Sequence, residues 1–463
     1  MAFASLTLLL QWSPLSLLII LTALFTAALL ALSFYRLFLH PLAKFPGPKL
    51  AAITILYEFY YDAIKRGQYT FEIGRMHEKY GPIVRINPNE LHVNDPTFID
   101  VLYAGGGKRR DKHPYYTGQF GVFGTVPHDL HRLRRSALNR FFSKAAVMKL
   151  EPVIARIVQK LCTQIGKHAG SGRPVTISNA FSCMTSDVVS EYAFAKSTDF
   201  LSTESPGFET NMHDALVGGS EMGLFMKNFP WIFKLLRAIP ESYLKFQNDM
   251  KTQIREVKEG KVPKSGNAGI TIFHEVLNGN LPEREKSVAR LWQEGQIIMG
   301  AGTETTAWII LEGLRLSYGV STRSPHIAHE PLFFKSSDPS QSNSFSWPSS
   351  QHSKSIEWEI PPGTPVGMTS VLIHHNPALF QNPKSFVPER WIDENGKRRH
   401  DLEGYLLSFS RGSRQCLGIN LAYAEMYMAL AAVVRTYGDR LQLYETTAED
   451  VDLHHDGIRV LVK

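Results

Sequence analysis

The sequence predicts a mainly α-helical fold with a small β region, preceded by one transmembrane helix. Three observations support this prediction. Apolar residues recur at helical spacing through residues 51–80, 150–277 and 282–311. Alternation of apolar and polar residues is clear only on either side of Pro88-Asn89, which predicts a β-hairpin over 84–93. An uncharged apolar run of helical length lies near the N-terminus.

The apolar run Leu15–Phe34 is the predicted membrane anchor. No Asp, Glu, Lys or Arg precedes Arg36, and a helix of this length spans about 30 Å, one bilayer core. A cleaved signal peptide is the alternative, but the run is long for one and has no basic segment before it. Basic residues follow at Arg36, Lys44 and Lys49, which predicts a single pass with the body on the cytosolic side. The predicted parts are an anchor over 1–35, a proline-rich hinge over 36–50 and a body over 51–463.

Composition limits the class of protein. The chain has 463 residues, a formal net charge of +7 and three cysteines. An odd and sparse set of cysteines gives no disulfide framework, which fits a reducing compartment. The basic residues form short clusters without interleaved aromatic residues, so no nucleic-acid partner is predicted. A basic surface of this kind favours a membrane or an acidic protein partner.

Two segments after the hairpin have an unusual composition. Residues 115–127 are rich in aromatic residues and glycine, which fits a loop with an apolar inner surface. Residues 128–142 predict a basic helix on which His131 and Arg135, four residues apart, share one face. On this pattern alone, a solvated basic helix is the favoured interpretation.

The longest predicted helix, 282–311, breaks its own pattern in the middle. Pro282 suits a first turn, and one face is small or apolar as far as Gly302. The sequence Gly-Ala-Gly-Thr-Glu-Thr-Thr at 300–306 then places poor helix formers in a helix interior. A Thr hydroxyl can bond a carbonyl one turn back, and a buried carboxylate is costly. Such local rule-breaking predicts a functional site at Glu304 and Thr305.

Cys416 is the cysteine most suited to chemistry. It follows Arg411 and Arg414 and precedes a predicted apolar helix. Neighbouring positive charge and a helix N-terminus both favour a thiolate. Gly412 and Gly418 allow the backbone to turn tightly and to approach a flat ligand. The alternative, a small buried apolar residue, leaves the two arginines unexplained.

At these residues the chain resembles the cytochrome P450 superfamily of haem-thiolate monooxygenases, in its membrane-bound fungal form. The resemblance covers nearly the whole chain and rests on four motifs in the right order. They are Phe-x-x-Gly-x-Arg-x-Cys-x-Gly at 409–418, Ala-Gly-x-Glu-Thr at 301–305, Glu-x-x-Arg at 312–315 and Phe-x-Pro-Glu-Arg at 386–390. The flanking sequence looks most like secondary-metabolism members, including the trichodiene-oxygenase-like group.

The resemblance implies a mainly α cytochrome P450 fold, helical with a small β region, around one buried heme (iron protoporphyrin IX). Cys416 is implied as the axial thiolate ligand of the iron. Phe409 and Gly418 belong to the same cofactor-binding loop. The implied partners of the haem propionates are Arg414, Arg135, His131 (where the family has an aromatic residue) and Arg323.

Further roles follow from the same resemblance. Glu304 and Thr305 are implied as the catalytic pair that relays protons while O2 is activated. The apolar segments Tyr115–Phe123 and Met222–Phe233, with residues before Ala301, are implied to line the substrate pocket. The expected substrate is therefore a lipophilic terpenoid or polyketide intermediate.

The electron source and the location are also expectations from the resemblance. No Gly-x-Gly-x-x-Gly nucleotide site occurs in the sequence. Electrons are therefore expected from NADPH–cytochrome P450 reductase, docked on the basic face near Cys416. The expected location is the endoplasmic reticulum membrane, with the catalytic domain 51–463 in the cytosol.

Two features depart from the family pattern. Glu312 follows Thr305 so closely that two further helices of the family have no room, so a segment is predicted to be missing between 306 and 312. A continuous helix through both motifs would misplace Glu312 and Arg315. A Ser-rich, low-complexity insertion is predicted at about 335–355. Altered splicing or a faulty gene model would explain both features.

Two other interpretations compete with a working monooxygenase. The first is an inactive or haem-poor relative, damaged by the missing segment, that at most binds ligands or partners at the membrane. The second is a haem-thiolate isomerase that uses no dioxygen. Glu304 and Thr305 argue against the isomerase, because such chemistry needs no proton relay.

Overall fold

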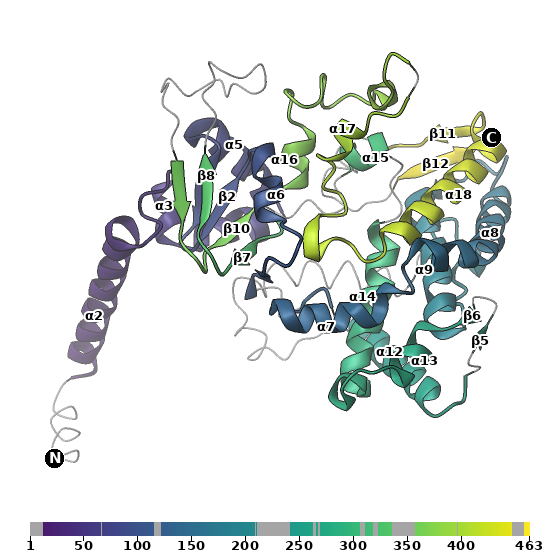
Figure 1. The fold of residues 1–463 in the computed structure, drawn as a ribbon, viewed down its shortest axis with the longest axis horizontal. Coiled ribbons are helices and arrows are strands. Elements are labelled where there is room, and N and C mark those ends of the chain that lie inside the picture. The colour runs from purple at the N-terminus through teal and green to yellow at the C-terminus, as the bar shows by residue number, and fades with distance from the viewer. Residues whose placement is uncertain are drawn as a thin grey trace.

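Figure 1 shows one helix projecting from a body in which the main sheet lies nearest that helix and the long helices fill the other side. The structure is a computed structural model. It describes residues 13–65, 67–114, 122–208, 210, 241–262, 265–266, 269–305, 311–317, 323–335, 357–395, 397–446 and 458–463.

The N-terminal helix consists of α2 (Pro14–Phe34) and a π-helical turn, η1 (Tyr35–Leu39). Ser13 caps it, because its hydroxyl accepts a hydrogen bond from the backbone N–H of Ser16. The two elements together give 26 residues, long and apolar enough to cross a membrane, and their apolar window is not buried by the body. Residues 40–48 are not helical, as the prolines predict.

The segment 51–80, expected to be helical, is divided. It forms α3 (Lys49–Ile53), α4 (Leu56–Phe59) with a π-helical turn η2 (Tyr60–Ile64), and α5 (Tyr69–Tyr80). Thr54 is extended and separates α3 from α4. The periodicity was misleading here because Glu58 and Asp62 are the buried side chains of their turn, where the pattern expects apolar residues.

The predicted hairpin is confirmed. β1 (Ile83–Asn87) pairs antiparallel with β2 (Glu90–Val93). This hairpin forms one edge of a mixed five-stranded sheet of order β1-β2-β10-β7-β3, whose other strands are β3 (Arg110–Lys112), β7 (His326–Ala328) and β10 (Pro365–Gly367). The antiparallel pairing of β3 with β7 places Lys112 directly opposite His326.

Small sheets complete the β region. β4 (Val175–Thr176), β12 (Arg459–Val462) and β11 (Leu441–Leu443) form one, and β5 (Ser265–Gly266) pairs with β6 (Gly269–Ile270). β8 (Leu332–Lys335) pairs antiparallel with β9 (Glu357–Ile360). The expected low-complexity insertion lies between these last two strands, where residues 336–356 are outside the described part of the chain.

The long helices share the largest apolar core. They are α7 (His128–Asn139), α8 (Lys144–Gly166), α9 (Ile177–Phe194), α12 (Glu241–Lys258), α13 (Ile272–Asn278), α14 (Val288–Thr305) and α18 (Ile419–Tyr437). This confirms the helical expectation for most of the described residues within 150–277.

The other elements of the described chain are short. They are η3 (Pro96–Phe98), α6 (Ile99–Leu102), η5 (Phe200–Ser202), η6 (Glu283–Lys286), α15 (Leu311–Leu316), α16 (Ser370–His374), η7 (Pro388–Trp391), α17 (His400–Glu403) and η8 (Gly412–Arg414). The helix expected over 282–311 therefore begins with η6 and continues as α14 to Thr305. Residues 306–310 lie outside the described residues.

Candidate functional site

The loop before α18 has a fixed shape. The backbone N–H of Cys416 donates a 2.8 Å hydrogen bond to the carbonyl of Phe409, which closes the loop. Gly412 has φ +68°, and a Cβ there would lie 2.1 Å from the carbonyl oxygen of Tyr103. Glycine is therefore required at 412 by a close approach of two backbones rather than by a ligand. At Gly418 a Cβ would meet no described atom within 4 Å.

Cys416 is partly buried. Burial raises its pKa, while a hydrogen bond from the backbone of Gly418 and the charge of Arg135 act in the opposite direction. Arg135 donates a 2.6 Å hydrogen bond to the carbonyl of Gln415, which ties α7 to the cysteine loop. The cation that acts on Cys416 is thus Arg135.

Arg411 does not have the role expected from its place beside the cysteine. Its guanidinium donates to the carbonyl of Gly404 at 2.6 Å and lies 3.5 Å from the carboxylate of Asp100. Arg411 therefore makes its contacts on the outer side of the cysteine loop. Proximity in sequence was misleading, because residues on a tight loop point in different directions.

Arg414 points into the protein, to the ends of β3 and α7. It donates to the carbonyl oxygens of Arg110, Thr125 and Val126, at distances from 2.7 to 3.4 Å. Burial lowers the pKa of Arg414 to about 10, with Asp111 acting to raise it and Arg135 to lower it. These four hydrogen bonds go to the neutral carbonyl oxygens of three residues, which do not cancel its positive charge.

Three further basic side chains are buried beside Arg414: Lys112, His131 and His326. Lys112 Nζ donates a 2.8 Å hydrogen bond to the carbonyl of Phe123 and lies 3.2 Å from the centre of that ring. Burial, followed by the charge of Arg414, lowers the pKa of Lys112 well below its ordinary value.

The two histidines are affected by the same cations. Burial is the main cause that lowers the pKa of His131 to about 2, with Arg414, Arg135 and Lys112 adding to it. Burial also lowers the pKa of His326 to about 3, with Lys112 and Arg414 contributing. The Nε2 atom of His326 is buried and makes no hydrogen bond within the described part of the chain.

This group of side chains fits an anionic cofactor. Basic side chains that are buried close together make each other's positive charge more costly, and the two propionates of a haem would supply compensating negative charge. A partly buried sulfur, a buried imidazole nitrogen without a hydrogen bond in the described part of the chain, and several basic side chains are a donor set that suits such a cofactor. Of the expected site residues, the structure brings together Cys416, Phe409, Gly418, Arg414, Arg135 and His131.

Lys112 and His326 were missed by sequence reasoning. Each is a single basic residue in a short strand, and only the pairing of β3 with β7 places them side by side. No motif marks them. The signal that could have found them is the run of basic residues at 108–112, which the sequence analysis treated as general surface charge.

Arg323 is not brought to this group. Its guanidinium binds the carboxylates of Glu58 and Glu90, at 2.7 Å in each case, and lies over the ring of Tyr69. Both carboxylates are buried. Arg323 therefore joins the sheet to α4, near the N-terminal helix, and His326, three residues later, lies close enough to Arg414 for that charge to lower its pKa.

The expected catalytic pair lies at the end of α14, where the backbone of Glu304 and Thr305 is helical. Side chains from Gly300 to Leu311 lie outside the described residues, so this assignment stays a prediction. Earlier in α14, Leu291 and Ile298 are buried, as the apolar face predicted.

The start of α14 is joined to the loop that carries Phe123. Glu294 accepts a 3.0 Å hydrogen bond from the backbone N–H of Val122 and pairs with Arg290. Of the expected substrate-binding segments, residues 115–121 and 211–240 lie outside the described part of the chain.

Glu312 and Arg315 occupy a buried ion-paired group in spite of the short connection from α14. Arg315 donates two hydrogen bonds to Glu312, of 2.7 and 3.0 Å. Arg390 Nε and Trp391 Nε1 also donate to Glu312, at 3.0 and 2.9 Å. Although burial acts to raise the pKa of Glu312, the hydrogen bonds from Arg315, Val387 and Trp391 lower it. The misplacement expected from a continuous helix is not found.

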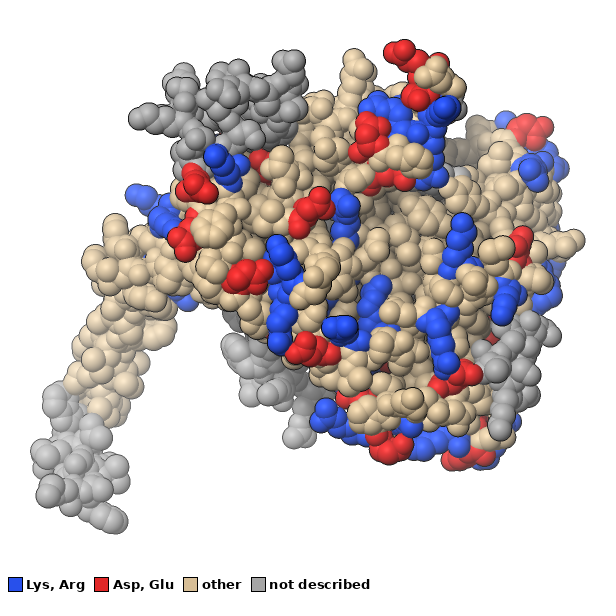
Figure 2. All heavy atoms as spheres, in the orientation of Figure 1, with Lys and Arg blue, Asp and Glu red and all other residues tan. Residues whose placement is uncertain are grey.

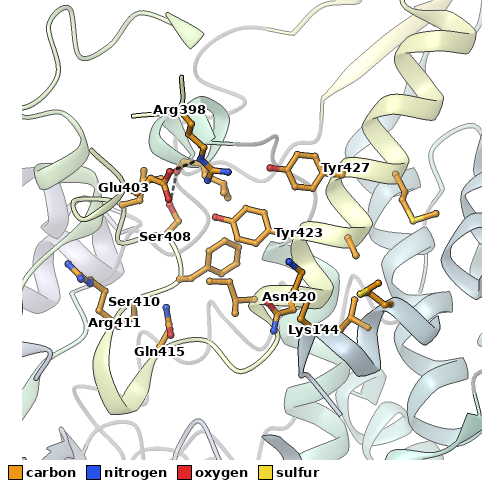
Figure 3. Close-up of a pocket in the computed structure, with 18 of the residues that line it drawn as sticks. Lys144, Arg398, Glu403, Ser408, Ser410, Arg411, Gln415, Asn420, Tyr423 and Tyr427 are labelled. Carbon is orange, nitrogen blue, oxygen red and sulfur yellow. Dashed lines mark hydrogen bonds and ion pairs between the residues drawn. The ribbon is translucent and has the colours of Figure 1, made fainter. Parts of the chain in front are cut away.

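A hollow of about 810 Å³ lies on the outer side of the cysteine loop. Figure 3 shows Tyr423 and Tyr427 of α18 on one side of it, with Arg398 hydrogen-bonded to Glu403 on another. Lys144, at the first turn of α8, also lines it. This face has an aromatic floor and basic side chains at its edge.

Comparison with known proteins gives a consistent result. A family model described as Cytochrome P450 matches residues 46–316 and 352–455. Similar proteins include the cytochrome P450 monooxygenase tpcC of Cochliobolus heterostrophus, 39% identical over 92% of this chain and 91% of that protein. The tryptophan 6-hydroxylase fscE of Fusarium equiseti is 37% identical over 93% and 92%. The fusicoccadiene C-8 hydroxylase of Phomopsis amygdali is 34% identical over 93% of each chain.

This chain is shorter than its alignments with these relatives. The alignment with tpcC runs over 501 positions, although this chain has 463 residues. That relative therefore carries residues that have no counterpart here.

Proposed function

This chain belongs to the cytochrome P450 monooxygenase family, which uses haem with a thiolate-ligated iron, and we propose that it oxidises a lipophilic secondary metabolite with O2 and electrons from a separate reductase. The observation that carries the proposal is the position of the partly buried Cys416 just before α18, beside a group of buried basic side chains. That combination provides one soft ligand for iron and several partners for two carboxylates.

The residues divide into two roles. Cys416 would hold the iron, with Phe409 fixing its loop and Gly418 donating a backbone hydrogen bond to the sulfur. The partners proposed for the propionates are Arg414, Arg135, His131, Lys112 and His326.

When bound, the haem supplies the activation of O2 that amino acids cannot perform, and one oxygen atom then enters a C–H bond of the substrate while the other leaves as water. Two electrons from the reductase and two protons balance this reaction. Glu304 and Thr305 are proposed to pass those protons, since they end the helix that faces the cofactor loop in the family pattern. Enclosure by α14 and the 122–126 loop would exclude bulk water from the reacting atoms.

The substrate class is proposed from the character of the relatives. Two of those relatives are a hydroxylase of tryptophan and a hydroxylase of fusicoccadiene. We expect a terpenoid or polyketide intermediate for this chain.

The proposed electron donor is NADPH–cytochrome P450 reductase at the endoplasmic reticulum membrane. Figure 2 shows several Lys and Arg side chains over the face that contains α7 and the start of α18. Lys144 is exposed there, at the edge of the hollow beside the cysteine loop. A basic face close to the thiolate suits an acidic electron-transfer partner.

The competing proposal is an inactive or haem-poor relative. The inactive or haem-poor relative is favoured by the fact that tpcC carries residues that have no counterpart in this chain. The intact Glu312–Arg315–Arg390 group favours a folded cofactor region instead. The missing segment between 306 and 312 therefore remains a prediction about the transcript, which sequencing would test.

A turnover experiment decides between the two. The full chain would be expressed in microsomes with a fungal reductase and supplied with NADPH, 18O2 and a set of terpenoid and polyketide intermediates. A working monooxygenase gives a product heavier by one 18O atom, and the Cys416→Ala variant gives none. Absence of haem in the purified wild-type chain would instead support the haem-poor relative.

A further inference from the structure

A series of aromatic rings leads from the cysteine loop to the surface of α18. The centroid of the Phe409 ring lies 5.3 Å from that of Tyr423, and the Tyr423 centroid lies 6.0 Å from that of Tyr427. Phe409 belongs to the loop itself, because its carbonyl accepts the hydrogen bond from the backbone N–H of Cys416. At the other end of the series, the side chain of Tyr427 is exposed to 45%. The rings therefore connect the loop of the proposed iron ligand with solvent.

Core packing does not account for the two tyrosines. They lie one helical turn apart on α18, and their ring planes differ by only 22°. A core position would enclose both rings, yet Tyr423 is only partly buried and Tyr427 is exposed. Both line the hollow of about 810 Å³ beside the cysteine loop. Figure 3 shows both phenolic oxygens on the side that faces Arg398 and Glu403.

The chemistry of these side chains suits the transfer of single electrons. A phenol can give up one electron if its proton leaves as well, whereas a Phe ring resists oxidation and only bridges its neighbours. Burial raises the pKa of Tyr423, so its hydroxyl keeps the proton until the ring is oxidised. Water in the open hollow can then take the proton. Met148 and Met428, whose thioethers are also readily oxidised, line the same hollow.

We propose that Phe409, Tyr423 and Tyr427 form a route by which a small thiol at the surface reduces an oxidised haem held by Cys416. One electron passes inward from ring to ring, and a neutral tyrosyl radical is left at Tyr427 while its proton enters the hollow. A thiol then returns one electron and one proton to Tyr427. Thiols are the proposed donors because the sparse cysteines of the chain indicate a reducing compartment, where thiols are kept reduced. The inference rests on the proposed haem and goes beyond monooxygenation.

The complete reaction is a thiol peroxidase activity, with an organic hydroperoxide as the oxidant. The O–O bond of the hydroperoxide breaks at the haem, and the two fragments take up two electrons and two protons to give an alcohol and water. Two thiols supply these electrons and protons in two successive passages through Tyr427, and the two thiyl radicals join as a disulfide. No C–H bond of a substrate takes part. The route would therefore remove an oxidant while the substrate pocket is empty.

Spin trapping tests the route on the full haem-loaded chain. The protein, without substrate or reductase, would be treated with cumene hydroperoxide and a nitroso spin trap, and peptide mass spectrometry would locate the adducts. We expect an adduct at Tyr427. Tyr423→Phe keeps the packing of the ring and removes only its hydroxyl, so the adduct at Tyr427 should be lost while the fold is retained. Tyr60→Phe is the matched control, which should keep that adduct, because Tyr60 of η2 is also exposed to 45%.

Glutathione provides a second measurement. Its addition should remove the adduct at Tyr427 and give glutathione disulfide, and Tyr427→Phe should lose this disulfide formation. An adduct at Tyr427 that persists in Tyr423→Phe would overturn the route. Equal adducts at Tyr60 and Tyr427 would also overturn it, because the oxidant would then be attacking exposed tyrosines directly.

The reduced, CO-bound spectrum of the same samples separates this inference from the proposed function. A chain without haem contradicts both. A chain with the spectrum of a thiolate-ligated haem but without an adduct at Tyr427 contradicts the electron route alone.

Discussion

The guanidinium of Arg315 and the carboxylate of Glu312 are joined by two hydrogen bonds of 2.7 and 3.0 Å in the buried interior, and both side chains are almost fully enclosed. Arg315 also donates to the carbonyl oxygens of His374, Pro383 and Ser385. The pair therefore joins α15 to α16 and to the segment before η7. This region supports the cysteine loop, because Ser408 Oγ donates to the carbonyl of Leu314 in α15.

Removal of one partner of this group should destabilise the protein strongly. Glu312→Ala leaves two buried guanidinium groups without a carboxylate, which costs about 3–5 kcal/mol of unfolding free energy. Asp401→Asn is the control, since its pair with Arg399 is exposed and contributes less than about 1 kcal/mol. Urea unfolding followed by circular dichroism measures both. Equal effects of the two substitutions would show that the Glu312 group is not structural.

Lys112→Met should change two properties in opposite directions. Without haem, the substitution removes a buried amino group whose pKa burial lowers, so the unfolding free energy should rise by about 1 kcal/mol. Haem affinity should fall by about tenfold or more, because a propionate loses a cationic partner. Thermal unfolding of the haem-free chain and transfer of haem to apomyoglobin measure the two effects. Lys108→Met, a change at an exposed lysine of the same basic run, should alter neither.

Stability should decrease in mild acid because of two buried histidines, His77 of α5 and His92 of β2. His77 and His92 share a 2.7 Å hydrogen bond, and burial lowers the pKa of His77 to about 4. Since the folded pKa lies below the unfolded value of 6.5, the unfolded chain binds the proton first as pH falls. The stability from this residue is therefore complete above about pH 6.5 and is lost between pH 6.5 and 4, by roughly 3 kcal/mol.

A substitution isolates that effect. His77→Gln keeps a donor and an acceptor but does not titrate, so its unfolding free energy should vary less over this pH range. His400→Gln removes an exposed histidine and should leave the pH dependence unchanged. If His77→Gln has the same pH profile as the unsubstituted chain, the loss arises elsewhere.

Reversal of charge at Lys144 should slow reduction by the partner. This lysine lies at the first residue of α8, next to the cysteine loop, whereas Lys167 is exposed at the other end of the same helix, about 34 Å away. Stopped-flow reduction at low salt should be about tenfold slower in Lys144→Glu and unchanged in Lys167→Glu, with the difference decreasing as salt is added. Equal rates in both variants would place the reductase on another face.

The sequence could predict the features that depend on local pattern. The hairpin, the helix before Thr305 and the helix after Cys416 follow from hydrophobic periodicity, and the N-terminal helix follows from an uncharged apolar run. The structure has all four elements. Arg414, in the motif around Cys416, points into the protein, and its contact with a propionate stays a prediction. Local pattern carries this information because each element buries one face of its own residues.

Features that depend on long-range pairing could not be predicted. Arg323 was expected beside the cofactor, but Glu58 and Glu90, far away in the sequence, hold it in the sheet. The proximity of Lys112 to His326 depends on the pairing of β3 with β7. The inward orientation of Glu58 likewise depends on its ion pair with Arg323. Helical periodicity cannot predict this orientation, because it assumes that acidic side chains face the solvent.

The most direct test of the central claim is the absorption spectrum of the reduced, CO-bound protein. We predict that the unsubstituted chain binds haem and gives the red-shifted Soret band of a thiolate-ligated iron, that Cys183→Ala keeps this band, and that Cys416→Ala loses it. Cys183 is the matched control because it is a buried cysteine on α9. A normal thiolate band in Cys416→Ala, or no haem in the unsubstituted chain, would contradict the account.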